Sequence, residues 1–187
     1  MSDADDTVLL QRAMQHDRGA FAALVLRHQG RVRGFLRRLC RDHALADDLA
    51  QECFLLAWRK LPELRTHSSL GAWLCSIAYR CFLQALRTRE REAALNALYT
   101  QPCQNEAETA EAGTELQARD LEQAMALLNP QEVAAITLHF SLGHSHSEIA
   151  EILDLPLGTV KSLLARALPK LRVHLTTDSG VRHHDER

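Results

Sequence analysis

The segment HSEIAEILDLPLGTVKSLLARALPKLR, residues 146–172, contains two short helical patterns separated by the turn sequence DLPLG. Ile149 and Leu153 of the first pattern can pack against Val160 and Leu164 of the second. A short helix, a tight turn and a second helix with a polar outer face are typical of a DNA-binding helix-turn-helix. Plain pairs of packed helices have the same spacing, so the segment alone leaves both interpretations open.

The rest of the chain contains further helical patterns with recognisable first and last residues, and no strand pattern. Asn129, Pro130 and Glu132 have the spacing of a capping box with proline in the first helical turn, and Ser145 and Glu148 repeat the capping-box spacing. We expect Gly143 to end the helix between them. Four helical patterns fill the first half of the chain, the first of them short, from about Val8 to Met14. The expected start and stop residues of the other three are Asp17, Asp42, Pro62 and Ser68 or Ser69.

Charge divides the chain into three parts. Residues 1–91 contain 15 Lys and Arg against 10 Asp and Glu, residues 92–122 contain one against seven, and residues 123–187 contain six against seven. The acidic middle part is also the least periodic, which predicts a flexible linker. We therefore expect an all-α protein of two small helical domains. The expected boundaries are 1–91 and 121–175 for the domains, 92–120 for the linker and 176–187 for a disordered tail.

Composition argues against several classes of protein. With 46% hydrophobic residues the 187-residue chain can form ordinary cores, yet no stretch approaches the roughly 18 apolar residues of a membrane span. The five cysteines form no C-x-x-C pair, which favours reduced, buried thiols. His139, His144 and His146 raise the alternative of a metal sensor or an enzyme, but no zinc spacing, phosphate loop or nucleophile motif accompanies them. We expect a cytosolic protein with no cofactor, metal or catalytic residue.

Two longer segments resemble a known family. DDLAQECFLLAWRKL at 47–61, followed by LGAWLCSIAYRCFLQALR at 70–87, resembles conserved region two of bacterial sigma factors. The segment from LNPQEV to PKLR, residues 128–172, resembles region four. Order, separation and the absence of further domains match the short extracytoplasmic-function class. The resemblance covers most of the chain and implies a region 2 helical bundle, a region 4 helix-turn-helix, and a factor that binds core RNA polymerase and directs promoter-specific transcription initiation.

The resemblance also implies partners and binding residues. The acidic helix would dock on the clamp helices of the largest polymerase subunit, the polymerase flap is a second contact, and an anti-sigma factor, often membrane-anchored, would hold the chain inactive. Melted bases of the −10 promoter element need aromatic surfaces and cations, and the −35 element needs a polar helix face. The implied residues are Asp48, Gln51 and Glu52 for core polymerase; Arg65, Thr66, His67, Tyr79, Arg80 and Arg87 for −10 DNA; and Thr159, Lys161, Ser162 and Arg166 for −35 DNA.

Three features depart from the family pattern. Where many members have W-L-Y-R-I-A-R-N, this chain has WLCSIAYR, with Cys75 in place of Tyr and Arg80 in place of Asn, which predicts a different base preference. KSLLARAL replaces K-S-R-L-x-R-A-R, so Leu163 and Leu168 stand where cations are common, and we expect fewer phosphate contacts. Pro169 should kink or end the last helix, expected from about residue 158 to 174.

The helix-turn-helix segment and the charged helix faces also have two other interpretations. A dimeric helix-turn-helix repressor would use residues 146–172 but would leave the DDLAQE helix without a role. The acidic and basic helix faces of the first domain could also be ordinary solvated surfaces. The acidic linker raises a separate hypothesis, that its charge repels DNA and keeps the free protein off promoters.

Overall fold

The computed structural model describes residues 3–64, 69–99 and 123–181, and in these ranges its regular structure is entirely helical, as predicted. A helical turn at 123–126 precedes α6. None of the helices in the described ranges has both the length and the apolarity to cross a lipid bilayer. In chain order the elements are α1 (Asp3–Met14), α2 (Arg18–Cys40), α3 (His43–Lys60), the 3₁₀ turn η1 (Leu61–Glu63), α4 (Leu70–Tyr99), α6 (Pro130–Ile136), the π-helical turn η2 (Thr137–Ser141), α7 (His146–Leu153) and α8 (Leu157–Val181).

Helices α2, α3 and α4 begin at the predicted residues, and α3 ends just before Pro62 as predicted. The side chains of Asp17 and Asp42 each accept a 3.0 Å hydrogen bond from the backbone N–H three residues later, which caps α2 and α3. Helix α3 ends at Lys60, and Pro62 lies in the 3₁₀ turn that follows. At the start of α4, the Ser69 hydroxyl accepts a 3.4 Å hydrogen bond from the Ala72 backbone. Helix α1 is longer than expected, since it begins at Asp3 and not near Val8.

Both predicted capping boxes are present in the second half. The Asn129 side chain accepts a hydrogen bond from the Glu132 backbone, and the Glu132 carboxylate accepts one from the Asn129 backbone. Ser145 and Glu148 make the same reciprocal pair at the start of α7. Gly143 has a φ of 73°, a left-handed conformation that glycine adopts without strain, and it follows the π-helical turn. These short-range signals therefore fix where α6 and α7 start.

Two helices extend beyond the predicted boundaries. Helix α4 continues through Tyr99, past the expected boundary at 91, because the sequence there is rich in helix formers such as Ala, Leu, Glu and Arg. Helix α8 continues past Pro169, which does not end it, and past residue 175 to Val181. Ala167 and Leu171 on either side of the proline are both buried, so packing holds the two parts of α8 on one core. Tertiary contacts here outweigh the hydrogen bond that proline removes.

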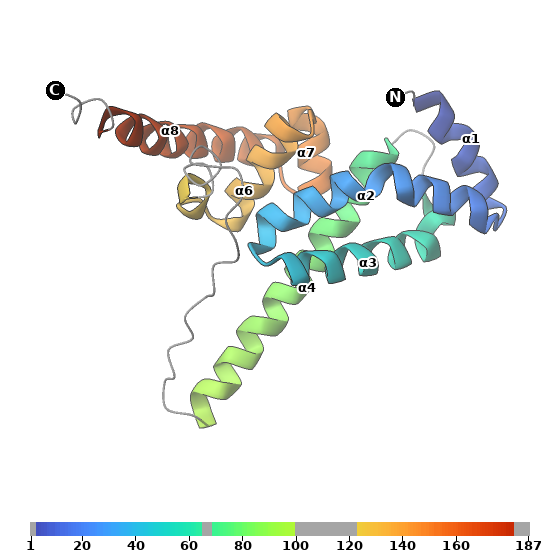
Figure 1. Cartoon of the computed structure of the whole chain (residues 1–187), viewed down its shortest axis with the longest axis horizontal. Helices are drawn as coiled ribbons and strands as arrows, with labels where there is room; N and C mark the ends of the chain where they lie inside the picture. Colours follow the sequence, from blue (N-terminus) through green and yellow to red (C-terminus); the bar gives the residue numbers. More distant parts are fainter. Residues whose placement is uncertain (1–2, 65–68, 100–122, 182–187) are drawn as a thin grey trace.

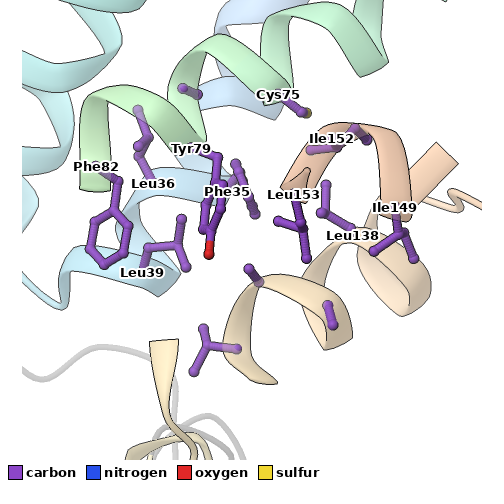
Figure 2. Packing of buried hydrophobic residues seen from close by; sticks show 14 of the residues in the cluster. Phe35, Leu36, Leu39, Cys75, Tyr79, Phe82, Leu138, Ile149, Ile152 and Leu153 are labelled. Carbon is purple, nitrogen blue, oxygen red and sulfur yellow. The ribbon is translucent and has the colours of Figure 1, made fainter. Parts of the chain in front are cut away.

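One hydrophobic core joins the two halves of the chain. Helix α2 contacts α6 and η2, and α4 contacts α7. Figure 1 shows α6, α7 and α8 lying together beside α2 and the first part of α4, while the second part of α4 projects away. Figure 2 shows the side chains that meet in this core. They include Phe35, Leu36, Leu39, Tyr79, Leu138, Ile149, Ile152 and Leu153, all of which are buried.

A smaller cluster holds α1 against α2. Ala13, Ala20, Leu24 and Leu61 are its buried members. The Asp6 carboxylate lies 2.9 Å from Arg27 and 2.7 Å from His28, both on α2. Burial acts to raise the pKa of Asp6, but the hydrogen bonds from these two side chains and their charges together lower it. Helix α1 is thus fixed to the outer side of α2.

Candidate functional site

Three polar side chains form a continuous exposed face on α3. Asp48, Gln51 and Glu52 are all exposed, and their spacing of three and four residues places them on one side of the helix. Leu49 and Cys53 point the other way and are buried at 5% and 0% exposure. The structure therefore brings together the three residues predicted to bind core polymerase and leaves them accessible.

Asp47 differs from these three residues. Its carboxylate lies 3.3 Å from Arg37 and 3.7 Å from Arg33, both on α2. These pairs are about 40% exposed, so each contributes little to stability. They orient α2 relative to α3 and leave the acidic face beside them without an arginine partner among the described ion pairs.

An apolar groove adjoins the acidic face. The groove lies between α2 and α3 and has a volume of about 530 Å³. Gln51 of the acidic face is one of its lining residues, and so is Leu55, which is 61% exposed. The sequence analysis did not predict this groove. A signal for it was present, since five successive apolar residues at 54–58 cannot all face one core. Its lining residues are Arg18, Phe21, Val25, Gln29, Arg33, Ala50, Gln51, Phe54, Leu55 and Trp58.

The residues predicted to bind −10 DNA fall into three groups: some lie outside the described residues, some are exposed and one is buried. Arg65, Thr66 and His67 lie outside the described residues. Arg80 and Arg87 are exposed and stand seven residues apart, two helical turns along the same side of α4.

Tyr79 is the exception, because it is only 2% exposed. Its ring lies 6.3 Å from the ring of Phe82, which is also buried, and burial raises the pKa of its hydroxyl. In this arrangement Tyr79 cannot stack on a base. Its predicted contact with −10 DNA remains a prediction that requires the core around it to open.

The predicted −35 residues lie on the outer surface of α8. Lys161, Ser162 and Arg166 are exposed, and Thr159 is partly exposed. The Ser162 hydroxyl donates a 2.8 Å hydrogen bond to the Thr159 carbonyl, and the Arg166 Nε donates one of 3.2 Å to the Ser162 carbonyl. Thr159, Ser162 and Arg166 therefore share one face near the start of the helix, and Lys161 is exposed at the edge of the outer surface.

The turn before α8 has the geometry of a helix-turn-helix. Asp154 ends α7 in a left-handed conformation with a φ of 54°, and the Leu155 N–H donates to the Ala150 carbonyl. The buried face of α8 packs on α7 in the shared core through Val160 and Leu164. This is the packing that the sequence predicted.

Leu163 and Leu168, which stand where cations are common in the family, differ in burial. Leu163 is 2% exposed and belongs to the core, whereas Leu168 is 42% exposed. An Arg at position 168 would reach solvent, whereas an Arg at position 163 would displace core side chains. The expectation of fewer phosphate contacts remains a prediction.

Glu132 carries a second role beyond its capping box. Its carboxylate is 2% exposed and lies 2.9 Å from the ammonium group of Lys170 on α8. Burial acts to raise the pKa of Glu132, but the Lys170 hydrogen bond, the Asn129 backbone and the nearby positive charges together lower it. This pair ties the start of α6 to α8.

The prediction of buried thiols holds for three of the five cysteines, while Cys40 is partly buried and Cys103 lies outside the described residues. Cys40, Cys53, Cys75 and Cys81 are free, and the last three are buried. Burial raises the pKa of Cys75 to about 12, so its thiol stays protonated and unreactive at neutral pH. Within the described ranges, no three His, Cys, Asp or Glu side chains are grouped closely enough to hold a metal ion.

Comparison with known proteins assigns the chain to a family. Residues 24–92 match Sigma-70 region 2, and residues 118–171 match Sigma-70 region 4. The ECF RNA polymerase sigma-E factor of Haemophilus influenzae is 31% identical over 176 residues, which are 87% of this chain and 90% of that protein. The ECF RNA polymerase sigma factor SigK of Mycobacterium tuberculosis is 30% identical over 177 residues, 91% of this chain and 92% of that one.

A solved structure agrees with these sequence matches. The sigma factor RpoE of Bartonella quintana, in complex with the anti-sigma factor NepR, superposes with a TM-score of 0.72 at 28% identity, covering 84% of this chain and 98% of that one. The chain belongs to the sigma-70 family of RNA polymerase sigma factors, in the extracytoplasmic-function class. Its region 2 comprises α2, α3 and α4, and its region 4 comprises α6, α7 and α8.

Proposed function

We propose that the chain binds core RNA polymerase through the acidic face of α3 and directs initiation at promoters through α4 and α8. The observation that carries the proposal is the exposure of Asp48, Gln51 and Glu52 on one face beside an apolar groove. A solvated helix face needs no such groove, whereas a docking surface combines an apolar centre with a polar rim. The proposed role requires no catalytic residue, and it places the protein in the cytoplasm with polymerase and promoter DNA.

Charge reversal tests the polymerase contact. The double variant Asp48→Lys, Glu52→Lys should fold normally, because both side chains are exposed, and should lose co-purification with core polymerase. The matched control is Glu90→Lys, Glu92→Lys, which makes the same charge change on exposed positions of α4. Undiminished binding by the folded α3 variant would return this face to ordinary solvated surface.

The outer face of α8 is proposed to read the −35 element. Removal of an Arg that makes two hydrogen bonds to one base should cost about 1 to 3 kcal/mol of binding free energy. It should also relax the base preference at that one position. Loss of a phosphate contact weakens all sequences alike. Holoenzyme affinity for −35 duplexes, measured for Arg166→Ala and Lys161→Ala, separates these roles. A folded Arg166→Ala protein with full affinity and unchanged preference would leave α7 and α8 as a plain helix pair.

The exposed cations of α4 are proposed to contact the −10 strand. Arg80→Ala and Arg87→Ala should each weaken holoenzyme binding to a single-stranded −10 oligonucleotide, and the loss should shrink as salt rises. The exposed Arg59 on α3 supplies the control substitution, Arg59→Ala. Equal losses of affinity for all three variants would show that any surface arginine attracts the oligonucleotide, and that Arg80 and Arg87 make no specific contact with the strand.

An anti-sigma factor is proposed as the regulatory partner. Support comes from RpoE of Bartonella quintana, whose structure contains the anti-sigma factor NepR. We propose that such a partner covers the groove between α2 and α3, and thereby competes with polymerase. Leu55→Asp, at an exposed groove position, should then weaken binding of both partners. Loss of only one would show that the two use different surfaces.

A further inference from the structure

Two histidine rings lie together where η2 is followed by α7. The ring centres of His139, in η2, and His146, the first residue of α7, are 4.9 Å apart, and the planes of the rings are inclined at 45°. Both side chains are partly exposed. The turn around Gly143 thus brings two imidazoles together at the surface of region 4, and the proposed contacts with polymerase and promoter use neither of them. We call these two side chains the histidine pair.

The spacing of the histidine pair fits a shared metal ion. A histidine nitrogen binds Zn²⁺ at about 2.0 to 2.1 Å, so two rings on one ion have centres about 4.5 to 5.2 Å apart for bond angles between about 90° and about 110°. The observed 4.9 Å lies within this range. Packed aromatic rings cover the same distances, so the spacing alone leaves simple packing as an alternative.

The hydrogen bonds of the two rings favour metal binding over simple packing. Nδ1 of His139 lies 2.9 Å from the His144 carbonyl oxygen, which can only accept, so the ring proton is on Nδ1. The Nε2 lone pair of the neutral His139 ring is therefore left for another ligand. Metal-binding histidines are usually held in this way, by a ring N–H that donates to a carbonyl or a carboxylate. Among the described residues, none forms a hydrogen bond with the His146 ring, so its nitrogens are accessible as well.

The surroundings of the histidine pair are compatible with a cation. Residues Thr137–Ser141 form a π-helical turn, which is rare and often occurs at functional sites. The exposed Phe140 ring lies edge-on to His139, with ring centres 4.7 Å apart. The positive end of α7 opposes a cation, and the Glu148 carboxylate in the first turn of α7 offsets that charge. Glu148 stays ionised, because hydrogen bonds from the backbone and hydroxyl of Ser145 lower its pKa.

We propose that His139 and His146 form a two-histidine site for a first-row transition-metal dication, which ties the end of η2 to the start of α7. Neutral imidazole suits Zn²⁺, Cu²⁺ and Ni²⁺. In the described ranges no third His, Cys, Asp or Glu side chain joins the pair, so water completes the coordination. Zinc motifs are recognised by three or four ligands at set spacings, and a site of two ligands has no such signature in the sequence. An ion that binds only the folded form stabilises that form.

Calorimetric titration of the full-length chain with NiCl₂ tests the site. Ni²⁺ is the probe, because free thiols do not reduce it. His139→Asn removes Nε2 but keeps an amide that can donate to the His144 carbonyl, so the fold should persist. His139→Asn and His146→Ala should each lower the affinity for Ni²⁺ at least about tenfold. The double variant should lose little more than either single variant, because one ion needs both rings.

A matched control removes another pair of histidines. His183→Ala, His184→Ala changes two neighbouring residues outside the described ranges, and it should keep the binding event that the single variants lose. In this control background, the first equivalent of paramagnetic Ni²⁺ should broaden the amide NMR signals of residues 139–147 before those of other helices. It should also raise the thermal unfolding midpoint, by an amount that grows with the concentration of Ni²⁺. Adding His146→Ala should abolish both effects.

Three results would overturn the proposal. Absence of Ni²⁺ binding in the control background would show that the histidine pair is simple aromatic packing. Losses of binding free energy that add in the double variant would show two histidines that bind metal independently. Affinity that falls only in the control would place the binding at His183 and His184. None of these measurements needs polymerase or promoter DNA, so failure of the metal site would leave the proposed function unaffected.

Discussion

The two regions of the molecule reach ordered structure by different means. Region 2 uses long helices, 23 residues in α2 and 18 in α3, each started by a single aspartate cap. Region 4 combines the 25-residue α8 with the short helices α6 and α7, which have 7 and 8 residues, and each of these two begins with a full capping box. Isolated helices shorter than about 12 to 15 residues are marginal in water. The difference teaches that region 4 depends more on helix-end chemistry and on the core it shares with region 2.

The largest expected effect comes from placing a charge in the core of region 4. Leu163→Arg should destabilise the protein by about 4 kcal/mol, because it buries an unpaired charge. Amide protection in α6–α8 should be lost before that of α2–α4, measured by hydrogen exchange. Leu168→Arg, at an exposed position of the same helix, should leave stability unchanged and steepen the salt dependence of promoter binding. If both variants were equally stable, the assignment of Leu163 to the core would be wrong.

Removing the buried carboxylate of region 4 should come next. Glu132→Gln should cost about 2 kcal/mol in urea unfolding, because it loses the charged hydrogen bond to Lys170 in a buried setting. Glu148→Gln changes the other capping box, whose carboxylate side chain is 41% exposed, and should cost clearly less. Equal losses would mean that burial of Glu132 adds nothing to its capping role.

Cap removal tests the comparison of the two regions directly. Ser145→Ala should cost about 1 kcal/mol and should raise exchange throughout α7, because so short a helix has few other hydrogen bonds. Asp42→Ala removes the corresponding cap of the long α3, where only the first turn should exchange faster. Faster amide exchange along the whole of α3 would show that a long helix depends on its cap as much as a short helix does.

The smallest expected effect is on pH dependence. His144 is 5% exposed, and burial is the main cause that lowers its pKa, with Arg31 acting in the same direction and Glu148 opposing. The folded protein therefore binds fewer protons than the unfolded chain just below pH 6.5, so stability present above that pH is lost as the pH falls. Urea midpoints at about pH 7.5 and about pH 5.5 should differ more for wild type than for His144→Leu. An identical difference in both proteins would assign the pH dependence to other groups.

Local signals in the sequence were sufficient for the starts of α2, α3, α6 and α7 and for the exposed acidic face of α3. Asn129 and Glu132, like Ser145 and Glu148, stand three residues apart, so their geometry is fixed by the helix itself. The burial of Tyr79 was not predictable in this way, because the residues around it include Leu153, 74 positions later in the chain. Lys170 was likewise not recognised as the partner of Glu132, 38 positions away. Contacts of that separation depend on how the two regions pack, which no local pattern encodes.

Helix α4 and the residues after it set the longest distance that the chain could span between region 2 and region 4. Thirty residues at 1.5 Å each make an arm of about 45 Å, and residues 88–95 along it are exposed. The 23 residues from 100 to 122 have a maximum contour length of about 80 Å. One turn of B-DNA is roughly 34 Å, so this contour length exceeds two such turns. We therefore expect the proposed −10 and −35 contacts to tolerate changes in the distance between them.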